Sequence, residues 1–126
     1  MTAAGEVLAT GSGQLGQLGM DTSKLACNSF RGIQSICDII DIAAGASHSV
    51  AVNANGQVYV WGSNDFCELG LPGKEPRFKP TLLESLSAHR ITSVNCGPHS
   101  TIAVNGTFVP SLTHSLTHSF TFDRPW

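Results

Sequence analysis

Residues 5–12 read Gly-Glu-Val-Leu-Ala-Thr-Gly-Ser, and residues 56–63 read Gly-Gln-Val-Tyr-Val-Trp-Gly-Ser, so one pattern occurs twice, 51 positions apart. The match runs on to a Leu-Gly pair that ends at Gly19 in the first copy and at Gly70 in the second. A second block, residues 42–53, recurs at 94–105 with an offset of 52, so the added residue lies in a connecting segment. Self-similarity at a period of about 50 residues is typical of propellers, solenoids and arrays. We therefore expect a repeat domain over residues 1–105, with units at approximately 5–55 and 56–105.

Residues 11–16, Gly-Ser-Gly-Gln-Leu-Gly, also match the G-x-G-x-x-G of a dinucleotide-binding loop. Such a loop should open a helix, but residues 20–32 have little helical periodicity and end in glycine. The two inner glycines become Asn64 and Cys67 in the second copy, although a phosphate-binding loop needs glycine for close backbone approach. The sequence therefore favours a structural repeat over a nucleotide site.

The apolar pattern indicates strands. Residues 50–52 and 58–61 flank Asn-Ala-Asn-Gly, which has the composition of a hairpin turn. Alternation places Val58 and Val60 on one face and two aromatic residues on the other, so the second strand is apolar on both faces. A strand of this kind lies between two layers, as in stacked propeller blades.

Other segments are expected to complete or separate the units. Residues 39–44 and 91–96 supply one further strand in each unit. The connectors, residues 20–38 and 71–90, vary in length, and prolines at 72, 76 and 80 are expected to keep the second connector out of regular structure.

The frame G-x-V-x-x-x-G-S-x-x-x-x-x-L-G, with Gly-Gln-Leu-Gly at 16–19 and Gly-Ala-Ser-His-Ser at 45–49, resembles the regulator of chromosome condensation repeat. The resemblance covers roughly residues 5–105, and members form a propeller of about seven four-stranded blades. It implies an all-β fold, a partial β-propeller of about two four-stranded blades. The second unit departs from the frame, because Cys-Glu-Leu-Gly stands at 67–70 and Ser100 stands opposite His48.

We expect ten positions to serve the repeat fold, and we expect no catalytic, cofactor-binding or metal-binding residues. The side-by-side hydroxyl and imidazole groups at 47–49 and 99–100 recur, which favours structural hydrogen bonding, because a hydrolytic triad also needs a third orienting group. The aromatic residue at 61 is expected to be a core residue between blades. The ten positions are Gly5, Gly11, Gly19, Gly45, His48, Gly56, Trp61, Gly62, Gly70 and Gly97.

Composition limits the function classes. The chain has 126 residues, 13% of them charged, and a formal net charge of −2, so it lacks the basic field of a nucleic-acid binder. No apolar run approaches a membrane span, and the N-terminus lacks the pattern of a secretion signal, which indicates a cytoplasmic or nuclear protein. The four cysteines include no C-x-x-C pair for zinc or redox chemistry.

Residues 106–126 depart from the repeat. Phe108 stands where the frame predicts a turn glycine, and Leu-Thr-His-Ser occurs twice in tandem at 112–119, as a translated microsatellite would encode. His114 and His118 have the spacing of a helical metal site, but the Thr, Ser and Pro around them disfavour a helix. We therefore expect a disordered tail that binds no metal.

The resemblance implies binding rather than covalent catalysis, so the chain is expected to be a protein-interaction module and not an enzyme. It implies two roles: guanine-nucleotide exchange on a small GTPase through rim loops, or a scaffold or adaptor in a ubiquitin ligase or another signalling protein. A branch of the family binds chromatin, which this composition supports weakly. We expect a protein partner, no membrane, no cofactor and no small-molecule substrate. Exchange needs loops from several blades, so this fragment is expected to be inactive by itself.

Overall fold

A computed structural model describes residues 1–20, 26–107 and 116–122 of the chain. The described part consists of strands joined by turns, with one single-turn 3₁₀ helix, η1 (Glu84–Leu86). The strands are β1 (Leu8–Ser12), β2 (Ala26–Gly32), β3 (Ile39–Ala44), β4 (His48–Asn53), β5 (Val58–Gly62), β6 (Arg77–Leu82), β7 (Ser93–Cys96), β8 (Thr101–Thr107) and β9 (Leu116–Phe122).

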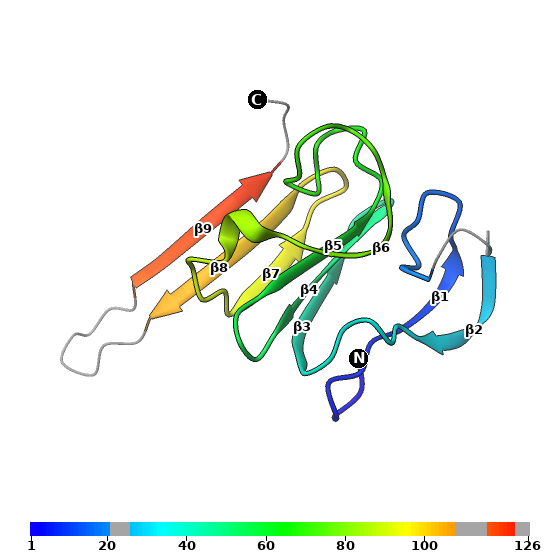
Figure 1. The fold of residues 1–126 in the computed structure, drawn as a ribbon, viewed down its shortest axis with the longest axis horizontal. Helices are drawn as coiled ribbons and strands as arrows, with labels where there is room; N and C mark the ends of the chain where they lie inside the picture. Colours follow the sequence, from blue (N-terminus) through cyan, green and yellow to red (C-terminus); the bar gives the residue numbers. More distant parts are fainter. Residues whose placement is uncertain (21–25, 108–115, 123–126) are drawn as a thin grey trace.

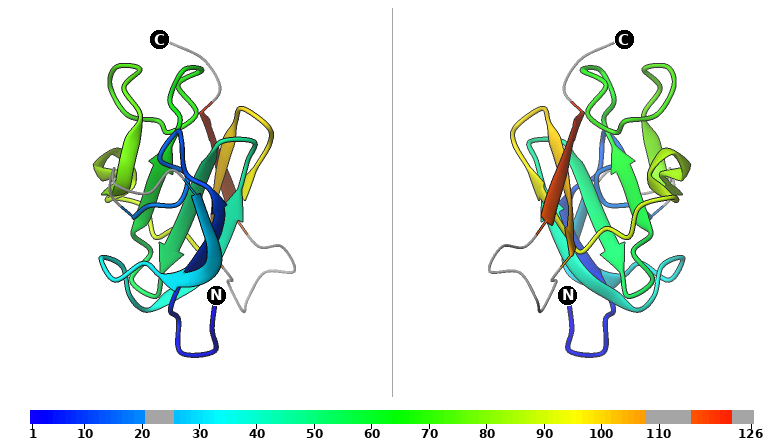
Figure 2. Two further views of the ribbon diagram at one scale, coloured as in Figure 1. Left: turned by 90° about the vertical axis from the view of Figure 1, so that its right-hand side faces the viewer. Right: turned by 90° about the vertical axis from the view of Figure 1, so that its left-hand side faces the viewer.

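The strands form three antiparallel sheets, in which consecutive strands are neighbours. The sheets are β1-β2, β3-β4-β5-β6 and β7-β8-β9. They lie beside one another in chain order, with the four-stranded sheet in the middle (Figures 1 and 2). Each sheet can therefore cover an apolar face of the next.

The sheets are offset from the sequence repeats. The middle sheet takes β3 and β4 from the first repeat and β5 and β6 from the second. The turn that joins the repeats is the hairpin between β4 and β5, closed by a hydrogen bond from the Gly56 amide to the Asn53 carbonyl (3.0 Å). The hairpin predicted over residues 50–61 is confirmed. The strands divide as two, four and three rather than into two complete sheets of four.

The two central strands of the middle sheet, β4 and β5, are buried on both faces. One face contributes Val50, Val52, Val58 and Val60 to a core shared with the segments after it. The other contributes Ala51 and Trp61 to a core shared with the segment before it. The prediction that the strand at residues 58–61, now β5, lies between two layers is confirmed. The remaining buried members are Leu69, Leu83, Leu86, Ile91, Val94 and Ala103 in the first core, and Val7, Ile33, Ile36 and Ile39 in the second.

Both connectors contain a strand, although we expected the second connector to lack regular structure. β2 lies in the first connector and β6 in the second, and β6 includes Pro80. The expectation from the prolines was wrong here because β6 is the outer strand of its sheet. An edge strand tolerates proline, since its missing N–H need not join the ladder.

The structure also departs from the expected disordered tail. Leu116–Phe122 forms β9 and pairs with β8. Its sequence places Thr, Ser and Thr between Leu, His, Phe and Phe, and both threonine and phenylalanine favour strands. Residues 108–115 and 123–126, which include His114, and the side chain of His118 lie outside the described parts, and so does the expectation about metal binding there.

Candidate interaction surface

The loops that follow β1, β3, β5 and β7 emerge at one end of the molecule, because successive strands run in opposite directions (Figures 1 and 2). We call this end the loop face, and its described loops are residues 13–20, 45–47, 63–76 and 97–100. The amide of Ala46 donates to the carbonyl of Pro98 (3.2 Å), which ties two of these loops together across the sheet boundary.

A buried chain of hydrogen bonds holds the loop face to the second and third sheets. The Thr101 hydroxyl donates to the carbonyl of Glu68 (2.7 Å), and its oxygen lies 3.0 Å from Nε2 of His48. A hydroxyl has only one proton, so the Thr101 oxygen accepts from a protonated Nε2. At most 1% of each of these three residues is exposed. These hydrogen bonds therefore link β4, β8 and the loop after β5 without access to water.

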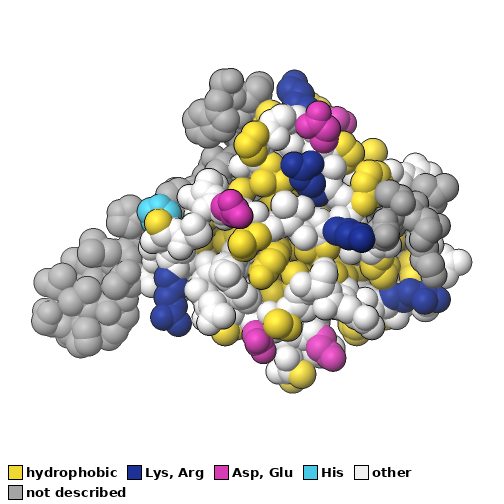
Figure 3. All heavy atoms as spheres, in the orientation of Figure 1, with side chains coloured by type: hydrophobic (Ala, Val, Ile, Leu, Met, Phe, Trp, Pro, Cys, Tyr) yellow, Lys and Arg dark blue, Asp and Glu magenta, His cyan; other side chains and the backbone are white. Residues whose placement is uncertain are grey.

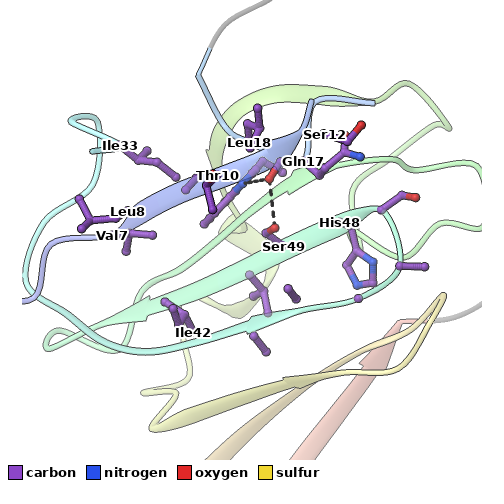
Figure 4. A pocket seen from close by; sticks show the side chains of 18 of the residues that line it. Val7, Leu8, Thr10, Ser12, Gln17, Leu18, Ile33, Ile42, His48 and Ser49 are labelled. Carbon is purple, nitrogen blue, oxygen red and sulfur yellow. Dashed lines mark hydrogen bonds between the residues drawn. The ribbon is translucent and has the colours of Figure 1, made fainter. Parts of the chain in front are cut away.

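The first unit contains an equivalent contact. The Ser49 hydroxyl donates to the carbonyl of Gln17 (3.2 Å), and the Trp61 indole N–H donates to the same oxygen (3.0 Å; Figure 4). Gln17 and Glu68 are 51 positions apart and Ser49 and Thr101 are 52 apart, which are the two offsets of the repeat. The structural hydrogen bonding predicted for residues 47–49 is confirmed at Ser49. Its counterpart Thr101 was not predicted, although both copies carry a hydroxyl residue at this position.

His48 is held as a neutral ring. Burial lowers the pKa of His48, while the charge of Glu68 and the backbone of Ser100 partly offset that shift and the charge of His99 adds to it. Among the described residues, its Nδ1 is the one buried side-chain polar atom without a hydrogen-bond partner. The ring lies against Gly45, where any Cβ would collide with it. This environment suits a packing and hydrogen-bonding group, because a general base needs reach to a substrate proton.

The structure distributes the ten predicted positions through the fold and does not gather them into one site. The carbonyls of Gly5 and Gly56 accept equivalent hydrogen bonds from Ile39 (3.1 Å) and Ile91 (3.3 Å). A Cβ at Gly19 would lie 2.9 Å from the Trp61 indole nitrogen. Gly97 lies under Ser100 as Gly45 lies under His48. Positive φ angles occur at Gly5, Gly11, Gly19, Gly56, Gly62 and Gly70.

An exposed aromatic pair lies on the loop face. The rings of Phe66 and His99 are 4.2 Å apart between centroids and are tilted by 36°. Phe66 is 52% exposed, although it is a large apolar side chain. The two residues come from the loops after β5 and β7, so they bridge neighbouring sheets. This pair was not predicted from the sequence, where the only signal was an aromatic residue between the Gly-Ser at 62–63 and the Leu-Gly pair that ends at Gly70.

Charge is dispersed over the surface. In Figure 3 the lysine and arginine side chains lie apart from one another on the face shown. The short basic stretch at 74–79 is divided between a loop and strand β6. The described residues on the face shown therefore form no continuous basic stripe of the kind that binds a phosphate backbone.

An apolar cavity of about 470 Å³ lies between β1 and the β3-β4 pair (Figure 4). Leu8, Ile33 and Ile42 line it, and Thr10 and Ser49 are among its few polar groups. Among the described residues, β1 has β2 on one side and no strand on the other. In the middle sheet, β3 and β4 lie beside β5 on this side, whereas the β1-β2 sheet has no such strands among the described residues. The cavity lies beside this unpaired side of β1.

In the part of the chain that the structure describes, no group of three or more His, Cys, Asp or Glu residues could hold a metal ion. Within the same residues, no helix is long and apolar enough to cross a membrane.

Comparison with known proteins relates the chain to larger molecules. Human E3 ubiquitin-protein ligase HERC2 is 35% identical over 99 residues, which is 77% of this chain and 2% of HERC2. Human WBSCR16 superposes with a TM-score of 0.74 at 23% identity, over 84% of this chain and 29% of that chain. Prp20p of Saccharomyces cerevisiae superposes with a TM-score of 0.72 at 26% identity, over 83% of this chain and 28% of its own. The Prp20p structure is described together with its binding properties to Gsp1p and histones.

Family models locate the repeats directly. The regulator of chromosome condensation (RCC1) repeat matches residues 4–52 and 55–104, and a second model of the same repeat matches residues 39–66. The matches and the superpositions confirm an all-β, partial β-propeller fold that serves as an interaction module. The two matched segments cover most of the 126 residues, so the chain belongs to the regulator of chromosome condensation repeat family.

Proposed function

We propose that this chain is the protein-binding part of a β-propeller and that its loop face contacts the partner. The exposed pair of Phe66 and His99 is the observation that carries this proposal. Aromatic residues on a protein surface supply much of the binding energy at interfaces. The buried hydrogen bonds of Thr101 hold the loops that carry this pair. The surface is therefore preorganised and loses little conformational entropy on binding.

The partner that we propose is a small GTPase, with the chain derived from a guanine-nucleotide exchange factor. The described binding of Prp20p to Gsp1p, at 26% identity to this chain, supports this proposal. A chromatin role has weaker support, because the histones named for Prp20p are basic partners and this chain has a net charge of only −2. We place the protein in the cytoplasm or nucleus.

A scaffold or adaptor role in a ubiquitin ligase is the second candidate. The 35% identity to HERC2, a named E3 ubiquitin-protein ligase, favours it. In that role the same loop face would hold a protein without acting on a nucleotide.

We also propose that the chain by itself has no exchange activity. It spans less than a third of the solved propeller chains, so it offers the loops of three sheets to a partner. The measurement is release of labelled nucleotide from a panel of small GTPases with the chain in excess. Acceleration of about tenfold, or 1.4 kcal/mol of barrier, by a monomeric chain would contradict this.

Binding through the loop face is tested with single variants. The full chain is immobilised and its affinity for each GTPase of the panel, and for a ubiquitin-conjugating enzyme, is measured by interferometry. Phe66→Ser should weaken any binding at least tenfold, as expected for a central aromatic residue. Asn55→Ala, in the exposed turn at the opposite end, is the matched control and should leave affinity unchanged. Equal affinities for the two variants would refute a role of the loop face.

A further inference from the structure

The outer edge of β8 carries an inference that is separate from the loop face. β8 has β7 on one side and β9 on the other. In the middle sheet the equivalent strand, β4, has β3 on one side and β5 on the other. β9 therefore takes the place on β8 that β5 takes on β4, although β9 lies outside both repeats.

The register makes the equivalence specific. β5 places two aromatic residues, two positions apart, opposite two residues of β4, and β9 places two phenylalanines opposite the equivalent residues of β8. The pairs are Ser49–Trp61 and Ala51–Tyr59 in the first case, and Thr101–Phe122 and Ala103–Phe120 in the second. Thr101 and Ala103 are 0% and 1% exposed, so the phenylalanines stand opposite the two buried positions of β8.

The second unit lacks the glycine of the tight turn that joins β4 to β5, which explains why more residues separate β8 from β9. β4 ends at a tight turn whose glycine, Gly56, has a φ of +80°. The equivalent position in the second unit is Phe108, and a bulky residue disfavours positive φ. β8 accordingly continues to Thr107, and its ladder with β9 extends to the Thr107–Leu116 pair.

We propose that the outer edge of β8 is a strand-accepting surface and that β9 is its built-in occupant, which stands in for a β5-type strand and prevents pairing with a second copy of the chain. An open edge presents unpaired N–H and C=O groups that template pairing with another chain. A segment with aromatic residues at alternate positions satisfies these groups and matches the register of β5. The residues after β9, Asp-Arg-Pro at 123–125, carry charges and a proline, which oppose further strand addition.

Hydrogen exchange of the full chain is the first test. The register turns the amides of Ala103 and Asn105 towards β9 and those of His118 and Phe120 towards β8. These four amides should exchange at least tenfold more slowly than in an unstructured peptide. In the Phe120→Pro variant the proline breaks the β8–β9 ladder, so the amides of Ala103 and Asn105 should lose this protection, while those of Ile102 and Val104, which face β7, should keep it. The chain should then form dimers or larger species in light scattering. Ser111→Pro, outside β9, is the control and should change neither measurement.

A peptide supplied in trans tests the specificity of the edge. A synthetic peptide of residues 116–126 should restore protection to the amides of Ala103 and Asn105 of the Phe120→Pro chain and return the chain to monomer. The same peptide with both phenylalanines replaced by serine should not. Exchange of the His118 and Phe120 amides of the native chain at unstructured rates would overturn the proposal without any variant, and this measurement decides if Phe120→Pro fails to fold. Unchanged protection and an unchanged oligomeric state in a folded Phe120→Pro chain would also overturn it.

Discussion

Replacing Thr101 by valine tests whether the buried hydrogen-bond chain joins the second and third sheets. Valine keeps the branched shape of threonine and removes only the hydroxyl. That hydroxyl satisfies Nε2 of His48 at 3.0 Å and the carbonyl of Glu68 at 2.7 Å, and all three residues are buried. Thr101→Val therefore leaves a donor and an acceptor without their partner in a place that water does not reach.

The expected cost follows from these two orphaned groups. A buried polar group left unpaired costs about 1–3 kcal/mol, so two should cost about 2–4 kcal/mol after partial relaxation. The repeat-equivalent change, Ser49→Ala, removes a longer bond of 3.2 Å at a half-buried position. The carbonyl of Gln17 keeps the indole N–H of Trp61, so Ser49→Ala should cost only about 0.5–1.5 kcal/mol.

The assay is urea unfolding followed by tryptophan fluorescence in a Trp126→Phe background, so that the signal comes from Trp61. Each free energy of unfolding is extrapolated to water, and equal slopes against urea are required for the comparison. A cost for Thr101→Val no greater than that for Ser49→Ala would refute the reasoning, because the second hydrogen bond would then contribute nothing.

Three further outcomes are expected. Because the pKa of His48 is lowered in the folded chain, the unfolded chain takes up a proton at this histidine first as the pH falls below about 6.5. The free energy of unfolding should therefore decrease from pH 7 towards the folded-state pKa and then level off. Between pH 7.5 and 5.0 the decrease should be smaller for His48→Gln than for the native chain. Gly62→Ala should cost about 1–3 kcal/mol more than Gly11→Ala, because both have positive φ but only a Cβ at Gly62 would meet the Ser47 carbonyl, at 2.5 Å; equal unfolding energies would contradict this contact. Burial raises the pKa of Cys96 to about 11, so at pH 8 a maleimide should modify exposed Cys37 long before Cys96, and comparable rates by mass spectrometry would contradict the burial.

The sequence predicted the central hairpin because its signals were local. Two apolar runs flank a turn of suitable composition, and alternation showed that β5 is apolar on both faces. β2 and β6 were missed for a physical reason. β2 reads Ala-Cys-Asn-Ser-Phe-Arg-Gly and is mostly exposed, while β6 contains a proline, so neither shows the alternation of a half-buried strand.

The candidate site could not be predicted in the same way because its contacts are not local. His48 and Thr101 are 53 positions apart, and Phe66 and His99 come from loops of different sheets. Residue type and spacing identified His48 as part of a His-Ser pair that occurs in both units, but only the stacking of two sheets gives its ring a partner. β9 shows the limit most clearly, because its low-complexity sequence predicts disorder, and only the structure shows that it pairs with β8.

The boundaries of the sequence repeats and those of the sheets do not coincide, and this offset joins one repeat to the next. A boundary drawn between the repeats falls in the turn at 53–57, between β4 and β5. These two strands contribute most of the fully buried apolar side chains among the described residues. Each repeat therefore ends with two strands that need the next repeat to complete their sheet, and the hairpin supplies that completion with almost no loop-closure entropy. The same logic explains β9, because the second repeat also ends with two strands and no third repeat follows within these residues. β9 supplies the missing neighbour because it pairs with β8 in the register in which β5 pairs with β4. To do so, a segment needs this register and aromatic residues at alternate positions, but it does not need to match the repeat sequence.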